Sequence, residues 1–284
     1  MTRTIITALA AVSIIALGAC NKQGSTTGNA AATDNTASGN AAAATGSIAG
    51  TWKADLSTVQ MDSKPDVMLL KDGTYSCSSC APPLTVAADG KFHAVTGRPY
   101  ADQISVKVDD DHTVTRTSQK AGKETGTSTM KVSADGKTLT VDWKDSSTPN
   151  VPPSSGEATE TRVAAGPAGA HLISGSWKSD KINNVSEDLL TTQYSVDGDT
   201  ITSKSAGQTY TAKFGGPAVP VQGDIGGTTV SVEKVGDNGI RETYHRGGKV
   251  VSVATSTLGA DGKLSVVSEN KQNGSTLRYE AAKS

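Results

Sequence analysis

The sequence is poor in aromatic residues and has no excess of either charge. Aromatic residues make up 4% of the 284 residues, and the formal net charge is −1. A nucleic-acid interface needs basic residues gathered on one face, commonly with aromatic side chains between them, and the sequence has no such cluster. So few aromatic rings also argue against a wide, aromatic-lined pocket. Nucleic acid therefore has no support as a partner, and we expect any β-barrel to be filled by aliphatic side chains.

Patterns typical of catalysis and metal binding are also missing. No G-x-S-x-G segment is present that could hold a nucleophilic serine on a sharp turn. Asp109-Asp110-Asp111 lacks the alternating ligands and the distant glutamate of a calcium loop, which favours a solvated turn. We therefore predict a protein that is not an enzyme and that uses no metal and no cofactor. The histidines show no H-x-x-x-H spacing, and they are His93, His112, His171 and His245.

The chain begins with a short apolar run. Arg3 precedes a mostly apolar stretch from Ile5 to Leu17, which is too short to cross a bilayer as a stable helix. Small residues follow, in Leu17-Gly18-Ala19-Cys20. A positive residue, an apolar run and small residues in this order are typical of a secretory signal that is removed. We expect residues 1–19 to be this signal peptide.

The segment L-G-A-C also resembles the bacterial lipobox at every position. The resemblance implies that Cys20 becomes the mature N-terminus, carries lipid such as palmitate and attaches the protein to a membrane. Asn21 follows, and by resemblance to lipoprotein sorting a residue other than Asp there favours the outer membrane, facing the periplasm. The alternative is an ordinary secretory signal with a chance cysteine.

Residues 20–47 continue from the lipid-bearing cysteine with little besides Ala, Thr, Gly, Ser and Asn. Such a segment cannot bury enough apolar surface to offset the entropy lost on ordering. We expect it to be a flexible tether that holds a soluble body away from the membrane.

The two remaining cysteines stand close together in Cys77-Ser78-Ser79-Cys80. An even number of cysteines in an oxidising compartment favours a disulfide, and a zinc site would need two further ligands. A thioredoxin-like site would start a helix here, but Ala81-Pro82-Pro83 follows. We predict a Cys77–Cys80 disulfide that closes a tight loop, with thiol–disulfide activity as the alternative.

The body of the chain contains an internal repeat. Gly50-Thr51-Trp52-Lys53 returns as Gly175-Ser176-Trp177-Lys178, an offset of 125 (175 − 50), and Ala134-Asp135-Gly136-Lys137 returns as Ala260-Asp261-Gly262-Lys263, an offset of 126 (260 − 134). Two copies are too few for a solenoid. We therefore expect two similar domains, residues 48–164 and 172–284, joined by a linker at 165–171.

Both copies show the alternation typical of strands. Ile104-Ser105-Val106-Lys107-Val108 and Leu139-Thr140-Val141-Asp142-Trp143 alternate apolar with polar residues. Asp-Gly and Asn-Gly pairs recur between such segments and suit tight hairpin turns. We expect an all-β fold in which each copy forms an antiparallel meander of about eight strands, closed into a barrel.

The motif G-[TS]-W-K on a first strand resembles the lipocalin and calycin pattern, in which the tryptophan packs at the barrel floor. The resemblance implies that Trp52 and Trp177 are core residues. From Gly50 onward the chain also resembles uncharacterised exported lipocalin-like proteins of Gram-negative bacteria. The resemblance supplies no activity.

These patterns together predict a membrane-tethered envelope lipoprotein that is a non-enzymatic binding or interaction module. A protein and a small apolar ligand both remain open as partners. The alternatives are thiol–disulfide exchange at Cys77 and Cys80 and inhibition of an envelope or external hydrolase. Aromatic residues that could contact a partner at a binding surface are Tyr75, Trp143, Tyr194, Tyr210 and Tyr244.

Overall fold

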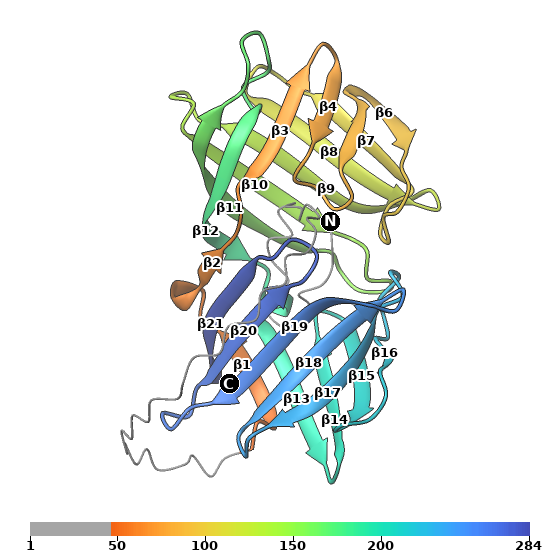
Figure 1. The fold of residues 1–284 in the computed structure, drawn as a ribbon, viewed down its shortest axis with the longest axis vertical. Coiled ribbons are helices and arrows are strands. Elements are labelled where there is room, and N and C mark those ends of the chain that lie inside the picture. The colour runs from red at the N-terminus through yellow and green to blue at the C-terminus, as the bar shows by residue number, and fades with distance from the viewer. Residues whose placement is uncertain (1–46) are drawn as a thin grey trace, which may run out of the picture.

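The computed structural model describes residues 47–284, and these residues are almost entirely β-strands (Figure 1). They form one 10-stranded and one 11-stranded antiparallel sheet, and each sheet curls into a nearly closed barrel. The predicted all-β fold of two barrels in tandem is therefore confirmed. The expectations for residues 1–19, for the lipid on Cys20 and for nearly all of the tether lie outside the described residues.

The first barrel is built from one continuous part of the chain, and it is the upper one in Figure 1. The β3–β4 hairpin shows why the sequence turns where it does: Asp72 and Gly73 have φ angles of 50° and 70°, as a two-residue type I′ turn requires. The strands of this barrel are β3 (Asp66–Lys71), β4 (Thr74–Cys77), β5 (Leu84–Ala87), β6 (Asp89–Ala94), β7 (Gln103–Val108), β8 (Thr113–Lys120), β9 (Lys123–Val132), β10 (Thr138–Asp145), β11 (Ser154–Ala165) and β12 (Gly175–Val185).

The second barrel combines the start of the described chain with its C-terminal part. Thr209 and Gln222 exchange two backbone hydrogen bonds of 3.2 and 2.8 Å, which help to close the sheet near its free edges. Two short helices, η1 (Leu56–Thr58) and α1 (Glu187–Leu190), interrupt the strands. The strands are β1 (Gly50–Ala54), β2 (Gln60–Asp62), β13 (Thr191–Asp197), β14 (Thr200–Ser205), β15 (Gln208–Lys213), β16 (Val219–Pro220), β17 (Thr229–Val235), β18 (Gly239–Arg246), β19 (Lys249–Leu258), β20 (Leu264–Asn270) and β21 (Thr276–Lys283).

Each repeat places its tryptophan strand in the barrel of the other repeat. β1, which carries Trp52, pairs with β13 and β21 of the second barrel. β12, which carries Trp177, pairs with β11 and β3 of the first barrel. The chain therefore passes between the barrels twice, once through residues 63–65 and once through residues 186–190 (Figure 1).

This exchange moves the domain boundaries away from those expected at 48–164, 165–171 and 172–284. Residues 166–174, expected to fall mostly in a linker, form the turn of the β11–β12 hairpin, where the amide of Gly166 donates to the carbonyl of Ser174 at 3.1 Å. The tryptophan strands of the two repeats are interchangeable in pattern, so the sequence does not reveal which barrel each one joins. A short hairpin costs little closure entropy, which favours pairing β12 with the strand just before it.

The two tryptophans anchor their barrels in the same way. Trp52 and Trp177 are 2% and 0% exposed, and each lies in the apolar core of the barrel that its strand joins. Each indole donates a hydrogen bond to the carbonyl four residues earlier, at 2.7 Å for Trp52 and 2.8 Å for Trp177. A cation also lies over each ring: Arg162 is 3.9 Å from the Trp177 centroid, and Lys283 is 5.6 Å from that of Trp52. Such contacts add to the stability gained from burying the ring.

Polar side chains from both barrels bind one another around Tyr100. Tyr100, between β6 and β7 of the first barrel, donates from its hydroxyl to Asp224 Oδ1 of the second at 2.6 Å. Arg246 donates to the Tyr100 hydroxyl at 2.7 Å and to Thr228 at 2.8 Å. The barrels are therefore held by side-chain contacts as well as by the exchanged strands.

Replacing each tryptophan tests the exchange. Because Trp52 packs in the second barrel, we expect Trp52→Ala to speed amide exchange in β13 and β21, although these strands belong to the other repeat. The loss should be about 3–5 kcal/mol, as for other large-to-small core changes. Hydrogen-exchange mass spectrometry of the full chain measures this.

Trp177→Ala is the matched control, and it should loosen β3 and β11 instead. If Trp52→Ala loosened the strands between residues 66 and 165 first, the exchanged topology would be contradicted.

Candidate functional site

The interior of the first barrel contains four ionisable side chains, which we call the acid–arginine cluster. Asp66 lies on β3, Tyr75 on β4, Arg116 on β8 and Glu160 on β11, and their exposed fractions are 3%, 0%, 5% and 0%. Charged side chains are almost never fully buried unless they are paired. The cluster is therefore the most unusual chemical feature of this barrel.

Several polar atoms of the cluster have no hydrogen-bond partner among the described residues. Both carboxylate oxygens of Glu160, Nε of Arg116 and the hydroxyl of Tyr75 are buried and unpartnered. Asp66 does have a partner, because the Ser79 hydroxyl donates to its Oδ1 at 3.1 Å. Leaving buried polar groups without partners costs free energy, which can be reduced by ordered water or by neutralising the charge.

Burial shifts both acids towards their neutral forms. It raises the pKa of Glu160 from an ordinary value of 4.5 to about 8. Burial also raises the pKa of Asp66 well above its usual value, and the charge of Glu160 adds to this effect, whereas Ser79 and Arg116 oppose it. Glu160 therefore keeps its proton at neutral pH, and the cluster has one permanent cation beside two acids that hold at least one proton.

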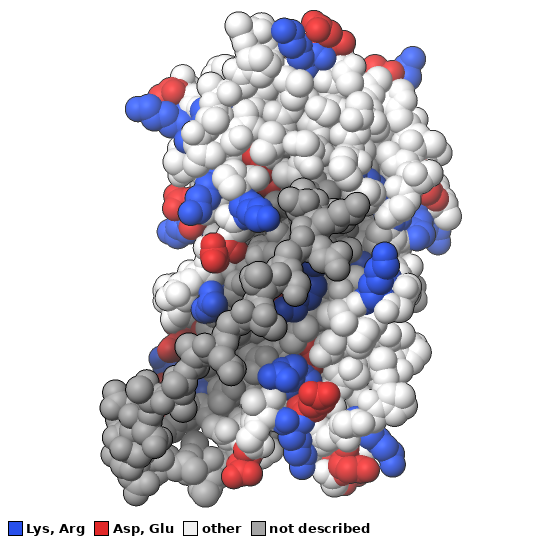
Figure 2. All heavy atoms as spheres, viewed as in Figure 1, with Lys and Arg blue, Asp and Glu red and all other residues white. Residues whose placement is uncertain are grey.

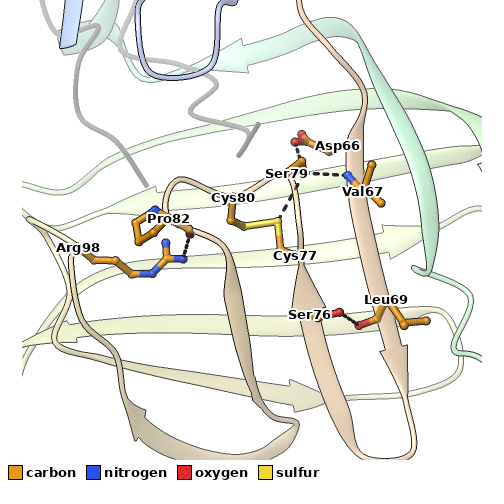
Figure 3. Close-up of a disulfide and its surroundings, with 9 residues drawn as sticks. All are labelled: Asp66, Val67, Leu69, Ser76, Cys77, Ser79, Cys80, Pro82 and Arg98. Carbon is orange, nitrogen blue, oxygen red and sulfur yellow. Dashed lines mark hydrogen bonds between the residues drawn. A yellow bond between two sulfur atoms is a disulfide. The ribbon is translucent and has the colours of Figure 1, made fainter. Parts of the chain in front are cut away.

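A disulfide loop contacts Asp66 of this cluster (Figure 3). Cys77 and Cys80 form a disulfide and are both 0% exposed. Within the loop, the Ser79 hydroxyl accepts from the amide of Val67 at 2.8 Å and also donates to Asp66. We call residues 77–82 the disulfide cap, since they connect the covalent staple directly to a buried acid of the cluster.

The second barrel buries a charge at the equivalent position but satisfies it differently. Glu242 on β18 corresponds to Arg116 on β8 at the repeat offset of 126 (242 − 116), and it is 0% exposed. Its carboxylate accepts hydrogen bonds from Tyr194 at 3.1 Å, from Tyr244 at 3.0 Å and from Tyr210. We call these four residues the tyrosine cluster.

The tyrosine cluster keeps its protons on the phenols. Burial raises the pKa of Tyr194, Tyr210 and Tyr244 well above the ordinary value, and the carboxylate of Glu242 raises it further. The three hydroxyls therefore remain donors to one carboxylate. At the same offset of 126, Tyr75 of the first barrel is replaced by Ile201 (201 − 75). Where the first barrel buries an arginine beside two acids, the second barrel thus buries a glutamate beside three tyrosines.

The described cavities in the second barrel are too small for anything larger than water. A cavity of about 20 Å³ lies beside Tyr210 and Tyr244, and another of about 10 Å³ lies between Trp52 and Tyr194. A single water needs about 10–15 Å³ of such space. These two cavities leave no room for a ligand larger than a water molecule.

The residues singled out from the sequence fall in different places. Cys20 lies outside the described residues, Cys77 and Cys80 form the staple of the cap, and the two tryptophans are core residues. The tyrosines considered for a binding surface lie inside the barrels and do not form such a surface, and Trp143 packs partly buried against the second core. The buried tyrosines are Tyr75, Tyr194, Tyr210 and Tyr244, with exposed fractions of 0%, 3%, 3% and 6%.

His112 and the acidic run at Asp109-Asp110-Asp111 belong to a local turn. His112 lies 3.0 Å from the carbonyl of Val132 through Nδ1, and its amide donates to Asp110 at 2.8 Å. His93 pairs with Asp89 at 2.8 Å on the surface. In the part of the chain that the structure describes, no group of three or more His, Cys, Asp or Glu residues is placed to hold a metal ion. None of the helices in that part is both long and apolar enough to cross a membrane.

The sequence analysis did not predict the buried charged residues of either barrel, although the sequence contained a signal for them. In β8, Val114 and Arg116 stand two residues apart and are buried with Ser118, whereas Thr115 and Thr117 between them are only partly buried. A residue two positions from a core valine on a strand faces the core. Charged residues in register with core residues were therefore the available clue.

No family model, curated protein or solved structure matches this chain.

The acid–arginine cluster should make stability depend on pH. Because the pKa of Glu160 is higher in the folded chain, its contribution is fully present below about pH 4.5 and is lost as the pH rises through about 8. Glu160→Gln cannot ionise, so its free energy of unfolding should exceed that of the wild type increasingly across this window, by up to about 1.4 kcal/mol per pH unit. Urea unfolding at a series of pH values measures this.

Glu157→Gln on the same strand is the matched control, because Glu157 is only partly buried. It should retain the wild-type slope. A Glu160→Gln protein that loses stability with pH as steeply as the wild type would show that Glu160 does not hold its proton in the fold.

Replacing one tyrosine of each cluster by phenylalanine should affect stability differently. Tyr194→Phe removes a donor to the buried carboxylate of Glu242, which should cost about 1–3 kcal/mol. Tyr75→Phe removes a buried hydroxyl that lies beside Arg116 but has no hydrogen bond of good geometry, so it should cost clearly less than Tyr194→Phe. Thermal and urea unfolding of both variants measure this. Equal losses in the two variants would refute the assigned hydrogen bonds.

Proposed function

We propose that this chain is a membrane-tethered envelope lipoprotein that acts as a non-enzymatic binding or interaction module. In this proposal the lipid on Cys20 anchors the chain to the outer membrane, on the periplasmic side that the sorting resemblance implies, and the two barrels form the folded body. The observation that supports the proposal is that the described cavities of the second barrel, of about 20 and 10 Å³, hold little more than a water each. This favours recognition on the outer surface over binding inside that barrel.

The outer surface favours a protein or an envelope polymer over a small apolar ligand. On the face seen in Figure 2, basic and acidic side chains are scattered over both barrels without a large area of one sign. Large apolar side chains with substantial exposure come from separate strands and loops, such as Phe92 at 39%, Val163 at 51% and Val250 at 42%. Single exposed apolar residues are normal on soluble surfaces, and a surface of this kind binds mainly through polar contacts.

The disulfide gives less support to thiol–disulfide exchange. Exchange needs an accessible sulfur that a thiolate can attack. Cys77 and Cys80 are both 0% exposed, and they are followed by Ala81-Pro82-Pro83 and not by a helix that would lower a thiol pKa. The staple role is the better explanation of these two residues.

The anchor is tested by expressing the full chain and its Cys20→Ser variant in a Gram-negative host. We expect the wild type in the membrane fraction, with a lipid mass on its N-terminal peptide, and the variant in the soluble fraction. A wild-type chain without lipid would refute the anchor.

The filled interior is tested on the soluble Cys20→Ser protein. Native mass spectrometry should give the mass of the polypeptide alone. A retained apolar ligand would refute binding on the outer surface alone, while leaving the lipid anchor unaffected.

A further inference from the structure

The disulfide cap contacts the acid–arginine cluster through Ser79 and is fastened to neighbouring segments by further hydrogen bonds (Figure 3). On one side, Ser79 binds Asp66 at 3.1 Å, and the amide of Ser78 donates to the carbonyl of Val67 at 3.1 Å. On the other side, Arg98 donates to the carbonyl of Pro82. The charge of Arg116 and burial both act on Arg98 and lower its pKa to about 10, with burial the larger cause. The cap is therefore hydrogen-bonded to Asp66, which is an acid of the cluster, and to Arg98, whose pKa depends in part on the charge of Arg116.

The charge inside the barrel depends on one proton. Arg116 is a permanent cation, and Asp66 and Glu160 are the two acids beside it. With one acid ionised, the three groups sum to zero. When the last proton leaves, two carboxylates face one guanidinium in an interior with no solvent, and the surplus negative charge must be hydrated or paired.

Arg162 closes the end of the barrel at the β11–β12 turn. The Arg162 guanidinium donates to the carbonyls of Gly136, Leu172 and Ser174, and it lies over the ring of Trp177. Opening that end would break several charge-assisted hydrogen bonds at once. Among the described hydrogen bonds that hold the cap, the Ser79–Asp66 bond is made to an acid of the cluster, so a change of charge there acts on the cap directly.

From this arrangement we propose that the disulfide cap is a pH-gated cover, which opens and admits water when the acid–arginine cluster loses the proton held by Asp66 and Glu160. The gate does not depend on the proposed function and goes beyond it. Tyr75 faces the same cluster from β4, and burial raises its pKa, so it stays neutral in the range where the acids ionise. Arg162, at the far end of β11, remains cationic. Arg98, from the loop after β6, has a pKa of about 10 and begins to lose its proton at about pH 9.5. Because Arg98 is also present in Glu160→Gln, that variant separates its effect from that of the two carboxyl groups, which we propose set the gate.

Reduction of the buried disulfide measures the opening. A water-soluble trialkylphosphine reductant breaks the Cys77–Cys80 bond, each sulfur gains a hydrogen, and the phosphine becomes its oxide with oxygen from water. The rate is measured for the folded chain at about pH 6 and about pH 9.5, and each value is divided by the rate for the chain in concentrated urea at the same pH. Because the open fraction follows ionisation, we expect this ratio to rise at least about tenfold in the wild type.

Three variants separate the gate from other causes. Glu160→Gln should keep the ratio low at both pH values, whereas the matched control Glu157→Gln should rise as the wild type does. Ser79→Ala releases the cap from Asp66 and should already be reduced faster at about pH 6. A wild-type ratio that does not change with pH, or an equal rise in Glu160→Gln, would overturn the proposal.

A readout without substitutions decides the question if Glu160→Gln does not fold. Hydrogen-exchange mass spectrometry of the wild type, corrected for the intrinsic effect of pH on exchange, should show residues 76–82 losing protection between about pH 6 and about pH 9.5. The hairpin β18–β19 of the second barrel serves as the internal reference. Loss of protection in both regions alike would mean global unfolding and would refute a local gate.

Discussion

Closure of each sheet depends on a tryptophan strand that pairs on both sides. In the second barrel, β1 lies between β13 and β21, and in the first barrel β12 lies between β3 and β11. Without this strand, two rows of backbone donors and acceptors would be left exposed at the edges, which invites pairing with other chains. The buried indole and the cation above it hold the strand in register, so the core and the hydrogen-bonded ladder stabilise each other.

Closure also creates the electrostatic problem that each barrel solves in its own way. A charge inside a closed barrel has no water to solvate it, and it must be paired, hydrogen-bonded or neutralised. The second barrel surrounds Glu242 with three phenol donors. The first barrel places two acids near Arg116 and leaves several of their atoms without a partner. The same position in the two repeats therefore leads to a satisfied site in one barrel and an unsatisfied one in the other.

The strands, one hairpin turn and the core tryptophans could be predicted from the sequence. Alternation marked the strands, Asp72-Gly73 marked a hairpin turn, and the repeated tryptophan marked the core. The exchange of strands could not be predicted, because β1 and β12 have the same pattern and each would fit either barrel. The acid–arginine cluster was hidden for another reason. Glu160 stands in a segment rich in Ser, Thr and Ala that looks solvent-exposed. The other members of its cluster come from β3, β4 and β8, which are distant in the sequence.

The reciprocal exchange also bears on how such a chain could have arisen and how it comes apart. A single ancestral copy holds every strand type that one barrel needs, including its own tryptophan strand. Once two copies exchange these strands, neither barrel contains only its own repeat. β1 belongs to the second barrel but leads along the chain into β3 of the first, so unfolding one barrel disturbs a segment connected to the other. We therefore expect the two cores to unfold together more than those of ordinary tandem domains, which can each unfold separately.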